Sequence, residues 1–170
     1  MTTLVSDTSG LVSLGIASGS DPDPLSVCLA TYDVRVPTEV IEELQKIASY
    51  NDDHGQAATA VCDRTTEMTI QSVDLDAEFP LDDGENAAVT LANKIDAEIF
   101  LCDEFNSLGL IHASLANTRL VTTPTLLSVL VRTKRLATDE ARTLLDEMSS
   151  ARSWETNSYV QRARSLLGNP

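Results

Sequence analysis

The chain has 170 residues, with 26 acidic and 12 basic side chains and a formal net charge of −14. One domain is the default at this length, and a hydrophobic content of 42% can build its core without a disulfide or a structural metal. The acid excess argues against a protein that grips nucleic acid through overall positive charge.

Short apolar runs alternate with helical patterns along the chain, which predicts an α/β domain whose central sheet is mainly parallel and has four to five strands. The expected strands are residues 3–6, 33–36, 68–73, 98–102 and 119–122, each followed by a segment of helical character. Residues 19–24 break the pattern, and residues 82–84 form a turn before a helix. Neither break is long enough to link two domains.

Charge is unevenly distributed. Residues 1–130 have a net charge of −16, whereas residues 131–170 have a net charge of +2. The C-terminal region is therefore the expected approach for a polyanion or an acidic partner, although solvated helix faces would explain it equally well. Its basic residues are Arg132, Lys134, Arg135, Arg142, Arg152, Arg162 and Arg164.

The composition also predicts the cellular setting. Lysine occurs at only three positions and aspartate outnumbers glutamate, which is typical of proteins that work in molar salt and suggests a halophilic source. Cys28, Cys62 and Cys102 are widely spaced and indicate reduced thiols. We find no signal-peptide pattern and no apolar run near the roughly 20 residues of a membrane span, so we expect a cytoplasmic protein without membrane contact.

Two acidic residues come directly after expected strands. Asp7 follows the run Leu4-Val5-Ser6, and Asp103 follows Ile99-Phe100-Leu101-Cys102. Ligands of open α/β sheets bind at the carboxyl ends of the strands, so both acids are candidate site residues. Each would also serve as a helix N-cap, which is the simpler interpretation of either one alone.

Two glutamates are expected on inward helix faces. On a helical wheel of residues 38–50, Glu43 borders the apolar arc, whereas Glu42 points to solvent. In the helix after Gly84, Glu85 lies inside the apolar arc. A helix N-terminus favours negative charge, and that alone would explain Glu85.

These four carboxylates have a chemistry in common. If Asp7, Glu43, Glu85 and Asp103 met at the carboxyl edge of the sheet, they could not all stay ionised without a cation. Carboxylate oxygens without His or Cys suit a hard ion, Mg²⁺ or Mn²⁺, which recruits phosphate oxygens. The set therefore predicts metal-dependent hydrolysis of phosphodiester bonds, which is nuclease chemistry.

The ordered acidic segments resemble the PIN-domain ribonucleases, the fold of VapC-type toxins, and within them an archaeal and bacterial subfamily. The resemblance spans nearly the whole chain, and its expected fold is a three-layer α/β/α domain. The segments that carry it are residues 5–11, 36–44, 81–92 and 99–104.

Several expectations follow from this resemblance. It implies that Asp7, Glu43, Glu85 and Asp103 are catalytic and hold Mg²⁺ or Mn²⁺ for RNA hydrolysis. Thr8, Ser9 and Glu104 are candidates for substrate contact or for support of the metal ligands. It also implies a nuclease domain over residues 1–150 and a C-terminal helical arm over residues 151–170. As a toxin the chain would pair with a small antitoxin protein. Separately, the region of Trp154 and Tyr159 is a candidate for docking that partner or a second copy in a homodimer, and the alternative is that Trp154 anchors the last helix.

Other classes fit less well. A haloacid-dehalogenase-like phosphatase needs a second aspartate at position 9, which is Ser9, and a response-regulator receiver needs an acidic pair and a late lysine that we cannot find. His54 and His112 are interpreted as structural. Two alternatives stay open: a PIN-fold RNA- or protein-binding module without turnover, and an RNA-processing or quality-control nuclease without an antitoxin.

Overall fold

The structure is a computed structural model that describes residues 1–168. Its strands are β1 (Thr2–Ser6), β2 (Tyr32–Pro37), β3 (Thr69–Gln71), β4 (Ile99–Leu101) and β5 (Arg119–Val121). All five predicted strands are therefore confirmed, most of them within a residue at each end. Residues 68–73 form a shorter strand than expected.

Helices make up most of the remaining secondary structure. They are α1 (Thr8–Ile16), α2 (Pro24–Thr31), α3 (Thr38–Ala48), α4 (Asp53–Cys62), α5 (Asp83–Lys94), α6 (Leu108–Ser114), α7 (Thr123–Arg132), α8 (Thr138–Arg152) and α9 (Ser158–Leu166), with one 3₁₀ turn at Thr65–Glu67. Among residues 1–168, no helix is long and apolar enough to cross a membrane.

Side chains that accept backbone hydrogen bonds fix where several helices begin. Asp7 caps α1, Asp23 caps α2 ahead of Pro24, and Asp82 caps α5 through the backbone N–H of Glu85 at 2.8 Å. These oxygens satisfy backbone donors that have no partner inside the helix. The predicted break at residues 19–24 and turn at residues 82–84 are the segments that lead into α2 and α5.

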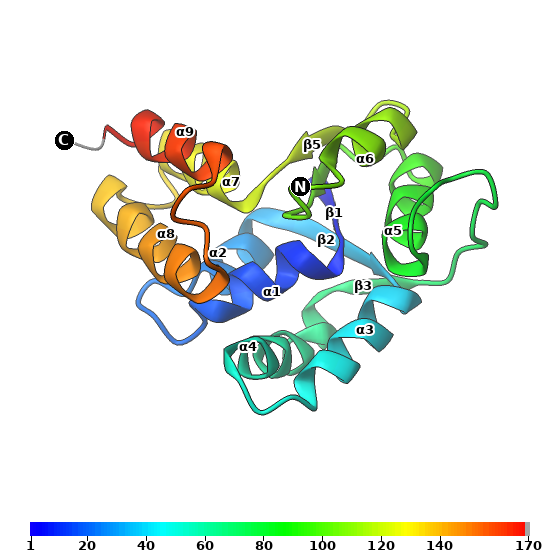
Figure 1. Ribbon diagram of the computed structural model, residues 1–170, viewed down its shortest axis with the longest axis horizontal. Helices are drawn as coiled ribbons and strands as arrows, with labels where there is room; N and C mark the ends of the chain where they lie inside the picture. The colour runs from blue at the N-terminus through cyan, green and yellow to red at the C-terminus, as the bar shows by residue number, and fades with distance from the viewer. Residues whose placement is uncertain (169–170) are drawn as a thin grey trace.

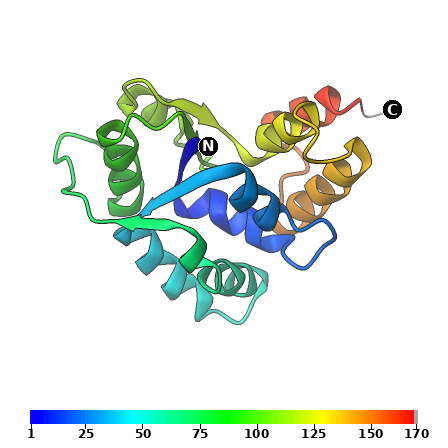
Figure 2. The ribbon, with the colours of Figure 1, turned by 180° about the vertical axis from the view of Figure 1, so that it is seen from behind.

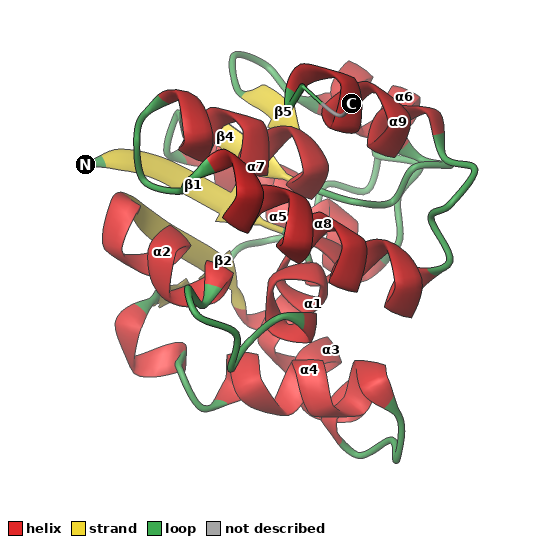
Figure 3. Cartoon of the chain, turned by 90° about the vertical axis from the view of Figure 1, so that its left-hand side faces the viewer, coloured by secondary structure: helices red, strands yellow, loops and turns green. Residues whose placement is uncertain are grey.

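The five strands form one parallel sheet in the order β3-β2-β1-β4-β5. The predicted α/β class and mainly parallel sheet are thus confirmed, and the architecture is consistent with the expected three-layer fold. Phe100 and Leu4 are fully buried at the centre of the sheet. Figure 3 shows the strands inside the molecule with helices around them.

The helices form groups around the sheet. α3 and α4 lie side by side beneath α1, as Figures 1 and 2 both show from opposite sides. α7, α8 and α9 gather at one end of the molecule, whereas α5 and α6 lie at the other end (Figure 1). The α1 helix thus lies between the two groups, with its N-terminus toward the middle of the sheet.

The chain order creates a switch point in the middle of this sheet. From β1 the chain proceeds to β2 and β3 on one side, then returns to add β4 and β5 on the other side of β1. The connection that leaves β1 and the connection that leaves β4 therefore run in opposite directions along the sheet. In open parallel sheets the crevice at the carboxyl ends of such strands is where ligands bind.

Candidate active site

Asp7 and Asp103 lie at this switch point. Asp7 follows β1 directly and Asp103 follows β4 by two positions, and the backbone N–H of Asp7 donates to Leu101 O at 3.1 Å. Both side chains are almost completely buried. The two acids singled out by their place after a strand are therefore at neighbouring strand ends.

Asp7 is both a helix cap and a buried acid. Its carboxylate accepts hydrogen bonds from Gly10 N at 3.0 Å, Ser9 Oγ at 2.8 Å and Cys102 Sγ at 3.0 Å. Burial raises the pKa of Asp7 to about 7 against the lowering effect of these hydrogen bonds, and the nearby charge of Asp103 raises it further. The cap interpretation is confirmed, and the same side chain stays a candidate site residue.

Asp103 is tied to the start of α7. Its two carboxylate oxygens accept hydrogen bonds from Thr123 N at 2.7 Å and Thr123 Oγ1 at 2.6 Å. Burial raises its pKa, and hydrogen bonds from Ser13 and Thr123 oppose that rise. Asp103 therefore joins the end of β4 to the helix that follows β5. Its own backbone N–H donates to Ser9 Oγ at 2.8 Å, which connects it to the Asp7 group.

Glu43 approaches the same edge from α3. Thr8 Oγ1, in the first turn of α1, donates a hydrogen bond to Glu43 Oε2. The Glu43 carboxylate also lies directly against Gly84, where a Cβ atom would collide with it. Glu43 is half-buried and Glu42 is exposed, as the helical wheel predicts. The missing side chain at position 84 thus leaves room for Glu43 beside the first turn of α5.

Glu85 completes the group from α5. The pKa of Glu85 is raised to about 7. Burial is the largest cause, and the negative charges of Asp82, Glu104 and Asp7 raise it further. For Glu43, burial again raises the pKa, a hydrogen bond from Thr8 lowers it, and the charges of Asp82 and Glu104 raise it. The charge of Asp7 therefore acts on Glu85, and the charge of the exposed Glu104 acts on both Glu43 and Glu85.

A pocket of about 240 Å³ opens beside these acids. We call it the carboxylate pocket; it is lined by Thr8, Ser9, Val12, Glu43, Ile47, Tyr50, His54, Glu104 and Arg152. Thr8, Ser9 and Glu104, the candidates for substrate contact or for support of the metal ligands, all line it. Asp7, Glu85 and Asp103 do not line it.

Arg152 and His54 are pocket residues that sequence reasoning did not assign to the site. Arg152 Nη1 and His54 Nε2 are buried and lack a hydrogen-bond partner within residues 1–168. Arg152 also lies over the ring of Trp154, with its Cζ atom 5.5 Å from the ring centroid. No local pattern could reveal them, because α4 and the end of α8 reach the pocket only through the tertiary fold.

The donor set has the chemistry of a hard-metal site. Its candidate ligands are all carboxylate oxygens, and two of them, on Asp7 and Glu85, have pKa values raised to about 7, which a bound cation would reverse. In the part of the chain that the structure describes, no group of three or more His, Cys, Asp or Glu side chains converges closely enough to hold an ion. The residues fit Mg²⁺ or Mn²⁺ by chemistry, and the side chains would have to turn toward it.

The fold and this acidic edge define an α/β protein with its site at the switch point of a parallel sheet. A family model described as a PIN domain, DUF3368, matches residues 3–169. Because that match covers nearly the whole chain, the protein belongs to this PIN-domain family, and the predicted family resemblance is confirmed at that level. PIN domains are generally nucleases and typically use divalent metals, so family membership supports a nuclease-type function. Neither the curated proteins nor the solved structures contain a match to the chain.

Proposed function

We propose that this protein is a divalent-metal-dependent endoribonuclease. The observation that supports the proposal is that Asp7, Glu43 and Glu85, from one strand end and two helices near the switch point of the sheet, have raised pKa values, with burial as the main cause and neighbouring acids adding to it. Carboxylates that are buried near other acids are unfavourable when ionised unless a cation binds. Solubility does not require acids that are buried or half-buried.

In this proposal the acidic residues bind the metal and two hydroxyl side chains position them. Asp7, Glu43, Glu85 and Asp103 would hold Mg²⁺ or Mn²⁺, with Glu104 as a further carboxylate at the mouth of the pocket. The metal would supply charge stabilisation for in-line displacement at a phosphodiester. Thr8 holds Glu43 through its hydroxyl, and Ser9 holds the carboxylate of Asp7 while accepting from the backbone of Asp103.

Arg152 gives the pocket a positive group among its acids. Its Nη1 atom is buried without a hydrogen-bond partner and would gain one by donating to a phosphate oxygen, which guanidinium groups bind well. A substrate with a bridging phosphate would thus meet carboxylates on one side and Arg152 on another. This arrangement supports a phosphodiester over a neutral substrate.

Cleavage of single-stranded RNA with Mn²⁺ or Mg²⁺ tests the proposal. We expect the wild-type protein to cleave, and D7N, E43Q and E85Q each to lose at least about a hundredfold in rate, because each removes a candidate ligand. E42Q is the matched control, since Glu42 is the exposed neighbour of Glu43 on the same helix. Equal rates in E43Q and E42Q would reject the metal site. No cleavage by the wild type with either metal would favour the binding module without turnover.

The cellular role is a separate proposal. A toxin of a toxin–antitoxin pair would bind a small partner protein, whereas an RNA-processing nuclease would act alone. The first observation is whether a small protein is encoded next to this chain; co-expression with that protein, followed by size-exclusion chromatography and an RNA cleavage assay, then separates the two roles. A complex that cleaves at least tenfold more slowly than the free chain indicates a toxin, and a lack of any complex favours RNA processing.

A further inference from the structure

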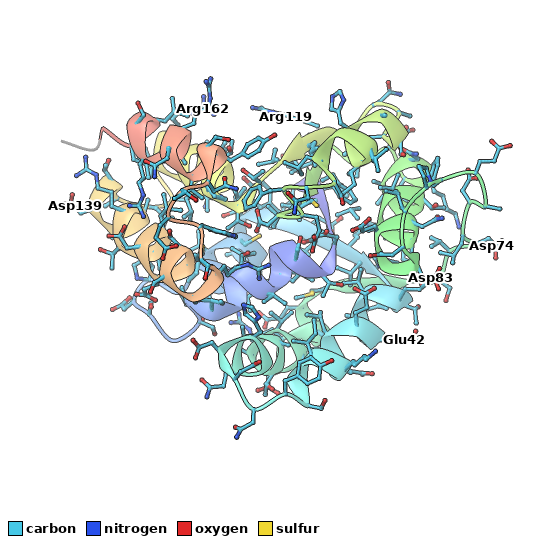
Figure 4. All side chains as sticks on the ribbon, in the orientation of Figure 1. Glu42, Asp74, Asp83, Arg119, Asp139 and Arg162 are labelled. Atoms are coloured by element: carbon cyan, nitrogen blue, oxygen red, sulfur yellow. The ribbon has the colours of Figure 1, made fainter. Side chains whose placement is uncertain are left out.

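A second pocket lies on the side of the molecule formed by β5, α7 and α9. We call it the arginine pocket; it has a volume of about 390 Å³ and is lined by Arg119, Thr125, Ser128, Val131, Arg132, Arg162, Leu166 and Leu167. Three of these side chains are arginines and none is acidic. In a chain with a net charge of −14, a pocket with only positive charges is unexpected. Figure 4 shows Arg119 and Arg162 on the same upper part of the molecule.

The three arginines have no carboxylate partner in residues 1–168. The salt bridges of that region use Arg35, Arg64, Arg142 and Arg164 instead, so these four cations are already paired. Arg119, Arg132 and Arg162 come from three different elements and line one pocket. Three like charges at one pocket repel one another unless an anion binds between them.

Ser128 gives the pocket an unused hydrogen-bond donor. Only 7% of the Ser128 surface is exposed, and its Oγ atom has no hydrogen-bond partner among the described residues. Most buried hydroxyl groups in proteins are paired, so an orphaned one beside three arginines indicates a missing acceptor. A phosphate oxygen would satisfy it, because phosphate accepts from guanidinium and hydroxyl groups together.

The surroundings favour a nucleic acid strand as the source of that phosphate. Thr125 also lines an adjoining pocket of about 340 Å³ with His112 and Tyr159, whose side chains are exposed. The Tyr159 ring stacks on Phe105 with centroids 5.4 Å apart, and Phe105 meets the edge of Trp154 at 5.3 Å. Arg152 covers the Trp154 ring and lines the carboxylate pocket.

Shared residues and side-chain contacts connect the pockets step by step. Thr125 lines both the arginine pocket and the adjoining pocket, Tyr159 lines the adjoining pocket, and Arg152 lines the carboxylate pocket. Alternating cationic and aromatic groups is the arrangement that single strands need, since arginines hold the phosphates and rings stack on the bases. A peptide carboxylate would use the arginines but would leave the exposed rings of Tyr159 and His112 unused.

We propose that the arginine pocket is a phosphate-binding subsite that anchors a single-stranded RNA several nucleotides from the carboxylate pocket. The inference rests on the proposed ribonuclease function for its choice of RNA. It explains how a strongly acidic protein holds a polyanion, because binding would be concentrated in one small cationic pocket. The rest of the surface would repel the strand and limit other binding positions.

RNA binding without cleavage tests the subsite. The probe is a fluorescein-labelled 12-nucleotide uridine RNA, titrated in EDTA by fluorescence anisotropy at the lowest KCl concentration at which circular dichroism shows a folded protein. We expect the triple variant R119Q/R132Q/R162Q to bind at least about tenfold more weakly than the wild type, with a smaller dependence of affinity on salt. S128A is expected to weaken binding by a few fold, because one donor is lost.

The control removes the same charge elsewhere. The variant K46Q/K94Q/K134Q also changes the net charge by three units, from −14 to −17, without touching the pocket. If it weakens RNA binding as much as the arginine variant, binding depends on overall charge and the subsite is rejected. Binding of a ten-residue polyglutamate peptide with an affinity equal to that of the RNA would reject phosphate as the ligand.

The two proposals fail in different ways. In EDTA the wild type cannot cleave by a metal-dependent route, so the binding result does not depend on catalysis. A protein that binds RNA through the three arginines yet cleaves nothing with Mn²⁺ or Mg²⁺ would keep the subsite and lose the nuclease proposal. A protein that cleaves at the wild-type rate after loss of all three arginines, on long and dinucleotide substrates alike, would lose the subsite alone.

Discussion

The α-carbon of Gly84 faces the carboxylate of Glu43 so closely that a methyl group at position 84 would overlap it. The contact joins the first turn of α5 to the Glu43 side chain of α3. Glu43, a candidate metal ligand, can occupy this position only because residue 84 of α5 has no side chain. Gly84 is therefore part of the site although it carries no functional group.

Replacing Gly84 with alanine should lower activity without lowering stability. In G84A the colliding atoms are the far end of a flexible side chain, so Glu43 can turn away, and alanine favours a helix by about 1 kcal/mol over glycine. We expect a thermal midpoint equal to or above that of the wild type and RNA cleavage reduced at least about tenfold. G109A is the control, because a Cβ atom at Gly109 meets nothing within 4 Å. A large loss of stability in G84A, or unchanged cleavage, would contradict this placement of Glu43.

The raised pKa of Asp7 predicts a dependence of stability on pH. Its pKa is about 7 in the fold against 3.8 for the free group, so the folded state binds the proton more strongly than the unfolded state. This contribution to stability is fully present below pH 3.8 and is lost as the pH rises to about 7. The metal-free protein should therefore have a lower thermal midpoint at pH 8 than at pH 5.5.

The D7N variant and Mn²⁺ provide the controls for this pH effect. D7N cannot ionise at that position, and asparagine can still cap α1, so the decline between pH 5.5 and 8 should be smaller. If the ionised carboxylates bind Mn²⁺ as proposed, the metal should raise the midpoint more at pH 8 than at pH 5.5. A decline as steep in D7N as in the wild type would remove Asp7 as its cause.

The hydrogen bond between Thr123 and Asp103 should stabilise the whole fold. T123V keeps the shape of the buried side chain but removes the hydroxyl donor to a buried carboxylate. Hydrogen bonds to charged groups contribute about 1.5–3 kcal/mol, so urea unfolding should show a loss of that size in the free energy of unfolding. T143V removes an exposed hydroxyl that donates to Asp139 O, and it should change stability by less than about 0.5 kcal/mol.

Arg152 should contribute to substrate binding more than to folding. R152Q keeps much of the side chain that packs near Trp154 but removes the positive charge from the carboxylate pocket. We expect kcat/KM for single-stranded RNA to fall about 10- to 100-fold, with a smaller fall in R152K, which keeps the charge without the planar fork. The control is R135Q, because Arg135 is exposed and lines neither pocket. A fall in R135Q as large as in R152Q would indicate loss of overall charge.

The sequence predicts the strands well for a physical reason. Buried parallel strands favour consecutive apolar residues, and Ile99-Phe100-Leu101 and Leu4-Val5 are such runs, each with an acid soon afterwards. The β3 strand is at the edge of the sheet, and its exposed Ile70 shows that an apolar residue there need not be buried. The expected strand at residues 68–73 was therefore too long.

The site is predictable in part. Asp7 and Glu43 are found by their place after a strand and on a helical wheel, because these patterns are local. The direction of the Asp103 carboxylate is not, since it depends on Thr123, which comes 20 residues later. The arginine pocket joins Arg119 to Arg162, and only the packing of α9 near α7 places them together.

The parallel sheet also determines when the site forms during folding. β1 pairs with β4 across a separation of about 95 residues, so the Asp7 edge is assembled only after this non-local pairing has closed. The carboxylate pocket then needs Arg152 from the end of α8. No contiguous fragment shorter than residues 8–152 contains every wall of that pocket. A chain that has not yet been synthesised as far as Arg152 would therefore be unable to form this pocket.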